Sequence, residues 1–379
     1  MNAPTDLTDR NRLQAYLEQG EQRLGGVKNR GPVRYTNDGK LHPEILEAFD
    51  RVGLYIFEGL VKPEELEELK ADCLKALDRL PVDKESMVDR NGQPAVGAGF
   101  DPPVVMWAKP LGDPWGGTEM MKGRHAVKMF EPEPPKDAPT EIPFILTGVL
   151  QFCDAALRAY GHPDILAIAA AVHGEDFVPF NEALIVKKAG LGASFAWHQD
   201  GVTHWNNPNW DPTIHGVNFM VQLYPCTAAN GMWYVPGSHR RGKVDLKTEI
   251  AQAGTNLLPD AVPIVCNAGD VCISNRQIVH GSFPNTSKDV RITLNMGFHR
   301  RSAIKGQRGI EGYGVTAYSD EVIAKRCEVI GMAIAARRKR YPNERSFDYQ
   351  PHSKSGVHFE WNDAARAVLS HYNQYDLVI

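Results

Sequence analysis

ASFAWHQD at 193–200 is the stretch of sequence on which the expected fold depends. It is one of seven short β-rich runs, and the others are EALIVKK (182–188), GVNFMVQLY (216–224), MWYVPGS (232–238), DVCISN (270–275), IVHGSF (278–283) and VRITLNMGF (290–298). Turn-forming text such as AGLG, AANG, NAGD and PNTSKD separates these runs. Short strands at fairly regular spacing are typical of a β-sandwich or barrel, so we expect a mainly β core over residues 180–300.

Helical text flanks this core on both sides, which predicts an α+β protein. We expect residues 1–40 to form a polar arm and residues 41–379 to form a single domain. Within that domain we expect a helical N-terminal part (41–179), interrupted by a long irregular insertion rich in Pro and Gly (82–143), and a helical C-terminal extension (301–379). The expected helices lie within 41–61, at 62–81, at 144–160, at 163–172 and at 319–342.

The composition excludes several classes of protein. Among 379 residues, 42 Lys and Arg and 46 Asp and Glu give a net charge of −4, with 42% hydrophobic residues, as in ordinary globular chains. No apolar run approaches the roughly 18 to 20 residues of a membrane-spanning helix, and the N-terminus lacks a signal-peptide pattern. The six cysteines are scattered without a CxxC pair. We therefore expect a cytoplasmic protein that binds neither nucleic acid nor membrane; the sequence specifies no oligomeric state.

The chemistry is expected at WHQD, 197–200. Alternate side chains of a strand share a face, so His198 and Asp200 point the same way. His280 ends a second β run 82 positions later (280 − 198), a separation that can bring two strands of one barrel together. Two histidines and a carboxylate with open positions suit a non-haem Fe(II) site. Arg291 follows 11 positions later (291 − 280), and its planar guanidinium matches a carboxylate, as a dicarboxylate co-substrate would present.

The chain resembles the phytanoyl-CoA dioxygenase (PhyH-like) superfamily of Fe(II)- and 2-oxoglutarate-dependent oxygenases. The resemblance is carried by WHQD (197–200), NGMWYVPGSHRRG (230–242), AGDVCISNRQIVHGSFPNTS (268–287), RITLNMGF (291–298) and the opening LHPEILEAFDRVGLYIFEGLVKPEELEELK (41–70). It implies a double-stranded β-helix, a cupin-like jelly-roll barrel, flanked by helices. It also implies that His198, Asp200 and His280 ligate iron and that Arg291 binds the distal carboxylate of 2-oxoglutarate. Ser282 matches a position that helps hold this carboxylate, although a turn serine bonded to backbone is an equal alternative.

The resemblance implies hydroxylation of an aliphatic C–H of a small-molecule substrate, with O2 consumed and 2-oxoglutarate decarboxylated to succinate and CO2. Desaturation and ring closure are known departures among relatives, and the presence of Asp200 argues against halogenation. One alternative is a non-redox cupin-like metal enzyme, a lyase, isomerase or hydrolase, which would not need Arg291. Another is a catalytically silent member that binds a ligand.

Substrate contacts are expected in the polar, aromatic loop after the metal ligands, HWNNPNWDP at 204–212. The candidates are Trp205, Asn206 and Trp210, for which simple loop packing is an equal alternative. The 82–143 insertion and the C-terminal helix are expected to cover the barrel mouth. His239 is expected to support the barrel structurally, and Lys187 and Lys188 are expected at a solvated strand end.

Overall fold

A computed structural model describes residues 8–201, 205, 213–308 and 317–369 of the chain, and its strands form two sheets. The large sheet has the order β1-β2-β10-β7-β12-β5-β4-β3 and the small sheet the order β6-β11-β8-β9. The large sheet consists of β1 (Arg30–Gly31), β2 (Leu54–Phe57), β3 (Val105–Ala108), β4 (Ile142–Thr147), β5 (Val178–Lys187), β7 (Gly216–Gln222), β10 (Val271–Asn275) and β12 (Arg291–His299). The small sheet consists of β6 (Phe195–His198), β8 (Trp233–Tyr234), β9 (Val262–Pro263) and β11 (His280–Ser282).

Each of the seven β-rich runs contains a strand, and together with β9 they form the core. Strand β12 lies between β5 and β7 and pairs antiparallel with both, so both of its edges are hydrogen-bonded. The mixed α and β architecture is confirmed, but the two sheets have open edges and do not form one closed barrel. Strand β9 was missed because two residues are too short a run to show alternation.

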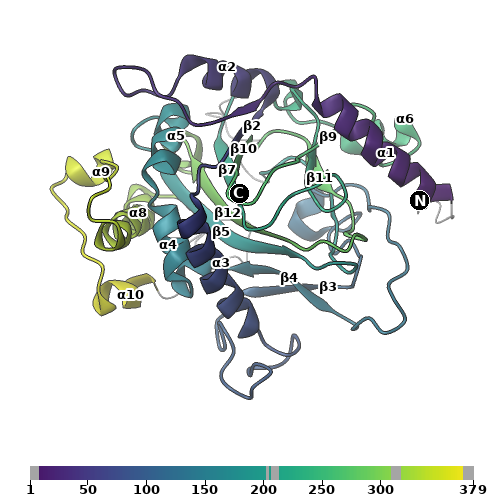
Figure 1. Ribbon diagram of the computed structural model, residues 1–379, viewed down its shortest axis with the longest axis horizontal. Helices are drawn as coiled ribbons and strands as arrows, with labels where there is room; N and C mark the ends of the chain where they lie inside the picture. Colours follow the sequence, from purple (N-terminus) through teal and green to yellow (C-terminus); the bar gives the residue numbers. More distant parts are fainter. Residues whose placement is uncertain (1–7, 202–204, 206–212, 309–316, 370–379) are drawn as a thin grey trace.

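The helices cover the sheets on opposite sides (Figure 1). They are α1 (Thr8–Leu24), α2 (Pro43–Val52), α3 (Pro63–Asp78), α4 (Asp154–Tyr160), α5 (Pro163–His173), α6 (Leu246–Ala253), α7 (Arg301–Ile304), α8 (Asp320–Arg340), α9 (Gln350–Ser353) and α10 (Asp363–Leu369), with 3-10 turns η1 (Met120–Gly123), η2 (Val149–Gln151) and η4 (Ser238–Arg241). Helices α3, α4, α5 and α8 gather on the side of β5 and β12, whereas α1 and α6 lie beside the small sheet.

Several expected helices are confirmed with their end signals. Helix α2 has proline at its first position and ends at Gly53, whose positive φ of 82° suits glycine and turns the chain into β2. Helix α8 begins after Ser319, whose hydroxyl accepts a hydrogen bond from the Val322 amide at 3.2 Å. Every helix of the described residues is too short or too polar to span a bilayer.

The expectation that residues 1–40 form a polar arm is corrected for residues 8–40, the part of this segment that the structure describes. Helix α1 packs on the small sheet, where the Tyr16 ring stacks on Trp233 with centroids 4.7 Å apart. The Tyr16 hydroxyl donates to the Leu258 carbonyl at 2.6 Å. Helix α1 can lie close to Trp233 because Gly20, the residue that faces this ring, has no side chain. The polar composition of α1 concealed its one apolar face.

Residues 142–153 correct a second expectation. The helix expected to begin at residue 144 begins at Asp154 instead, and Ile142–Thr147 forms β4, which pairs with β5. A short apolar run such as IPFILT fits a strand and a buried helix equally well. The 82–143 insertion is mostly irregular, as expected, but it also contains β3 and η1.

Candidate metal centre

Two histidines meet across the small sheet. His198 on β6 and His280 on β11 are direct cross-strand partners, and their ring centroids lie 4.1 Å apart. Asp200 lies just after β6, with its Oδ1 3.6 Å from His198 Nε2 and its Oδ2 3.9 Å from His280 Nε2. All three side chains are buried, and their ligand atoms lie within 4.8 Å of one another. The structure thus brings the three residues expected to bind metal to one point.

Backbone carbonyl groups fix the orientation of both imidazole rings. His198 Nδ1 lies 2.8 Å from the Ala196 carbonyl oxygen, and His280 Nδ1 lies 3.0 Å from the Ile278 carbonyl oxygen. A carbonyl oxygen can only accept a hydrogen bond, so each Nδ1 carries a proton, and in the neutral form of each ring Nε2 is the atom with the lone pair. Burial and the neighbouring His198 lower the pKa of His280 to about 3, which keeps the ring neutral. Nε2 is therefore the atom of each ring that a metal ion can bind.

Asp200 is held as an ionised carboxylate by several neighbours. Its Oδ2 accepts a 2.7 Å hydrogen bond from Asn218 Nδ2 on β7. Arg124 Nη1 lies 3.5 Å from Oδ1, and Arg276 Nη1 lies 4.0 Å from Oδ2. Burial is the largest single influence and raises the pKa of Asp200, but the attraction of neighbouring charges, Arg276 first and Arg124 among them, outweighs burial and holds the pKa well below its ordinary value. A buried anion of this kind is a strong cation ligand.

The irregular insertion contributes two side chains that sequence reasoning missed. Arg124 and His125 follow η1, and the His125 ring lies 4.3 Å from the His198 ring, centroid to centroid. His125 is fully buried beside Trp115, and neither of its ring nitrogens has a hydrogen-bond partner among the described residues. Burial lowers the pKa of His125, so this ring is neutral. No periodicity in the insertion could have shown that these two side chains point at the metal ligands.

A second cluster joins the two sheets and contains Arg291, Lys187 and Ser282. Arg291 begins β12 and pairs with Lys187 at the end of β5, and both side chains are buried. Lys187 Nζ donates to Ser282 Oγ on β11 at 2.9 Å and to the Phe283 carbonyl. The expectation that Lys187 lies at a solvated strand end is wrong, because β5 continues into the protein interior up to this residue. Burial, followed by the charge of Arg291, lowers the pKa of Lys187 well below its ordinary value.

This cluster has the composition of an anion site. Within the described part of the chain, the Nε of Arg291 has no hydrogen-bond partner, and no carboxylate forms an ion pair with either cation. Ser282 accepts a hydrogen bond from Lys187, whereas the turn-serine alternative would have bonded it to backbone. A buried guanidinium is costly unless an anion accompanies it, so the arrangement favours a bound carboxylate.

The candidate substrate residues lie in a segment that the structure describes only in part. Trp205 is described, and its ring lies 6.5 Å from that of His215, whereas His204, Asn206, Asn207 and Trp210 lie outside the described residues. His239 Nε2 contacts the Asp50 carbonyl oxygen at 2.9 Å, which fits the expected structural role.

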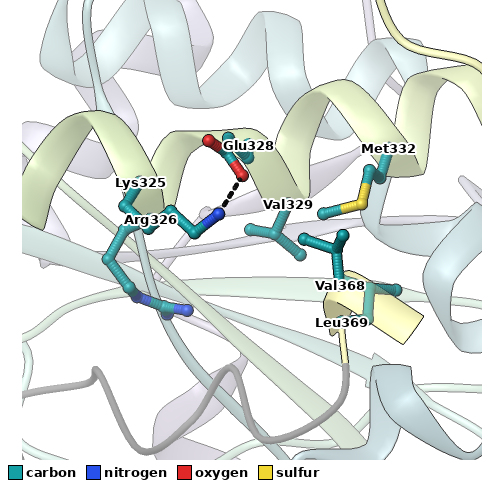
Figure 2. Close-up of a pocket in the computed structure, with 7 residues that line it drawn as sticks. All are labelled: Lys325, Arg326, Glu328, Val329, Met332, Val368 and Leu369. Atoms are coloured by element: carbon teal, nitrogen blue, oxygen red, sulfur yellow. Dashed lines mark hydrogen bonds and ion pairs between the residues drawn. The ribbon is translucent and has the colours of Figure 1, made fainter. Parts of the chain in front are cut away.

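A pocket between α8 and α10 lies outside the metal centre (Figure 2). It is lined by Lys325, Arg326, Glu328, Val329, Met332, Val368 and Leu369. Glu328 accepts a hydrogen bond from Lys325 at 2.8 Å, so its carboxylate is already paired. None of the residues that surround Asp200 or Arg291 lines this pocket, and its lining is largely apolar. We therefore do not place the chemistry there.

Known proteins similar to this chain support the family resemblance. Residues 49–293 match the family model described as phytanoyl-CoA dioxygenase (PhyH). Phytanoyl-CoA dioxygenase 1 of Oryza sativa subsp. japonica is 28% identical over 120 residues, which are 30% of this chain and 41% of the relative. Ectoine dioxygenase of Nocardia farcinica is 24% identical over 203 residues, 53% of this chain and 52% of the relative. The chain thus spans about half the length of the curated relatives it matches, or less.

Solved structures show a similar but more distant likeness. The crystal structure of EctD from S. alaskensis with 2-oxoglutarate and 5-hydroxyectoine is 19% identical, with 72% of this chain and 80% of that chain covered and a TM-score of 0.49. AviO1 from Streptomyces viridochromogenes Tue57 is 21% identical, with 68% and 94% covered and a TM-score of 0.46.

Proposed function

The chain belongs to the phytanoyl-CoA dioxygenase family, and from this premise we propose that it is an Fe(II)- and 2-oxoglutarate-dependent oxygenase. It would hydroxylate an aliphatic C–H of a small-molecule substrate while 2-oxoglutarate is decarboxylated to succinate and CO2. The observation that carries the proposal is the convergence of His198, Asp200 and His280 within 4.8 Å of one another in the interior. In the same proposal, strands β5–β12 form a double-stranded β-helix, because successive strands alternate between the two sheets except for β8 and β9, which both lie in the small sheet.

The donor set fits the metal. Two neutral imidazole nitrogens and one ionised carboxylate are the ligands that non-haem Fe(II) oxygenases use, and they leave the other coordination positions open. Bound there, iron would supply the open positions at which the keto acid and O2 react. The backbone contacts of His198 and His280 keep both Nε2 atoms directed at the ion, and Asn218 holds the Asp200 carboxylate in place.

The Arg291 cluster fits the co-substrate. We assign the distal carboxylate of 2-oxoglutarate to Arg291 and Lys187, with Ser282 as a hydroxyl donor once Lys187 has fixed its position. Two buried cations without a carboxylate of the described residues are unfavourable in the free protein, so they favour a dicarboxylate ligand. A non-redox metal enzyme of the same shape would have no use for this cluster, which argues against that alternative.

An anaerobic titration tests the proposed function. Addition of 2-oxoglutarate to the Fe(II)-loaded protein should produce the weak visible charge-transfer band of a chelated keto acid. With O2 and a substrate, succinate should appear in step with a product that has gained one oxygen atom, which separates hydroxylation from desaturation. Absence of the band at saturating 2-oxoglutarate would contradict the proposal. The control is His358→Ala, a variant at an exposed histidine, which should form the band as the wild type does.

A further inference from the structure

Arg124 and Arg276 are two buried guanidinium groups that share one carboxylate. Arg124 lies beside Oδ1 of Asp200 at 3.5 Å and Arg276 beside Oδ2 at 4.0 Å. Their side chains are 13% and 5% exposed. The Nε atoms of both arginines lack a hydrogen-bond partner within residues 8–201, 205, 213–308 and 317–369. Both arginines therefore have unused hydrogen-bonding capacity in the protein interior.

The local charges do not balance once Asp200 binds a cation. In the metal-loaded protein the Asp200 carboxylate is committed to the metal ion, and no other carboxylate of the described residues pairs with Arg124 or Arg276. Arg276 has partial compensation, because its Nη1 donates to Asn218 Oδ1 at 3.1 Å and its guanidinium lies 4.3 Å from the centre of the Phe180 ring. Two buried cations beside a bound cation are strongly unfavourable without an added anion.

The co-substrate is not the anion that this pair requires. One end of 2-oxoglutarate is assigned to the metal and the other to Arg291 and Lys187, which lie at the paired ends of β12 and β5. Arg124 comes from the irregular insertion, and Arg276 follows β10. Both carboxylates of 2-oxoglutarate are thus assigned elsewhere, one to the metal ion and the other to Arg291 and Lys187. We therefore expect a further anion to arrive with a second molecule that approaches the metal.

His125 adds a second, independent observation at the same place. It is adjacent to Arg124, fully buried, and lies against the His198 ring. Both of its ring nitrogens lack a partner among the described residues, although buried polar atoms are nearly always hydrogen-bonded. A neutral imidazole offers one donor and one acceptor, so His125 can bind a polar group of a ligand held by the two arginines.

We propose that Arg124 and Arg276 bind a carboxylate of the substrate, with His125 as a hydrogen-bonding neighbour. The substrate class is thus a small organic acid whose acid group lies close to the reacting carbon. This inference rests on the proposed function, because the same metal centre would oxidise the molecule. The competing explanation is that both arginines serve only as counter-ions that hold Asp200.

Matched pairs of acids and amides test this assignment. The probes are hexanoate with hexanamide, octanoate with octanamide, and phenylacetate with phenylacetamide, added anaerobically to the protein loaded with Fe(II) and 2-oxoglutarate. The readout is the dissociation constant obtained from the change in the charge-transfer band. We expect at least one acid to bind about 10-fold more tightly than its amide, since an unpaired buried cation penalises the neutral partner.

Variants assign that preference to Arg124. Arg124→Gln should weaken acid binding about 10- to 100-fold and leave the dissociation constant of 2-oxoglutarate within about twofold. Arg124→Lys should restore part of the acid preference, because it restores the charge without the planar fork. Arg90→Gln is the matched control, since Arg90 lies in the same insertion with a 67% exposed side chain and should bind the acids as wild type does.

The outcomes separate this inference from the proposed function. If the wild type forms the charge-transfer band but no pair favours the acid, the inference is overturned and the oxygenase proposal stands. Unchanged acid binding in Arg124→Gln would also overturn it. If the wild type forms no band, the proposed function itself fails. A thermal melt shows whether Arg124→Gln is folded; if it is not, the acid preference of the wild type and of Arg124→Lys decides.

Discussion

The two pairs of buried cations in this protein differ in what holds them. Lys187 and Arg291 are cross-strand partners at the paired ends of β5 and β12, and Lys187 is anchored to β11. Arg124 and Arg276 instead come from an irregular insertion and from the turn after β10, and they meet at Asp200. The first pair is built into regular strands and suits one invariant ligand. The second depends partly on a loop and suits a ligand that differs between relatives.

The largest expected effect comes from removing a metal ligand, because the ligands of both cation pairs are proposed to meet at the metal ion. His198→Ala should abolish the charge-transfer band and lower succinate formation on the order of 10³-fold or more, since loss even of an outer-shell partner costs about 10- to 100-fold. Succinate production measured with saturating Fe(II) and 2-oxoglutarate checks this result. Activity above a tenth of wild type would show that His198 is not a metal ligand.

The next effect should separate the two pairs. Arg291→Met should weaken 2-oxoglutarate binding about 100-fold, because two hydrogen bonds between charged groups are lost at roughly 1.5 kcal/mol or more each. Its preference for acids over amides, measured at saturating 2-oxoglutarate, should stay that of the wild type. Arg124→Gln should show the reverse pattern. If each variant impaired both properties equally, the two pairs would form one site and the comparison would fail.

Lys187→Met should weaken 2-oxoglutarate binding less than Arg291→Met does. It should not lower the stability of the ligand-free protein. We expect 2-oxoglutarate to bind about 10-fold more weakly, since one of two cations is lost. The melting temperature of the ligand-free protein should be equal or higher, because a buried charge is replaced by an apolar side chain of similar size. Unchanged affinity for 2-oxoglutarate would remove Lys187 from the co-substrate site.

Ser282→Ala should have the smallest effect. A single neutral hydrogen bond is worth about 0.5 to 1.5 kcal/mol, so 2-oxoglutarate affinity should fall by roughly 2- to 10-fold. Calorimetric titration of the Mn(II)-loaded protein can resolve this difference without turnover. Ser355→Ala, at an exposed hydroxyl beyond α9, is the control. An affinity equal to that of the control would leave Ser282 with a backbone-positioning role.

The strand alternation made His198 and Asp200 predictable as neighbours, because two residues apart in an extended chain share a face. His280 was predictable as their partner because it lies in a separate β-rich run. Arg291 was expected on the strand after His280, and it lies there, but β12 belongs to the other sheet. The contact between the two sheets runs through Lys187, whose burial depends on tertiary packing that a polar strand end does not show.

The positions of Arg124 and His125 within the insertion could not be predicted from the sequence, for a physical reason. Periodicity reports the buried face of a helix or strand, and Arg124 and His125 lie in neither. Their position depends on how residues 109–141 fold back over β6, which no local pattern encodes. The expectation that the insertion covers the site fits where these two residues lie, but only the structure identifies which side chains reach the metal ligands.

The most direct test is a crystal structure of the protein loaded anaerobically with Fe(II) and 2-oxoglutarate, with iron located by its anomalous scattering. The account predicts an iron peak between His198, Asp200 and His280. It also predicts that the distal carboxylate of 2-oxoglutarate lies on Arg291 and Lys187, with Arg124 and Arg276 left for a second ligand. Iron bound elsewhere, or the distal carboxylate bound to Arg124 and Arg276, would contradict it.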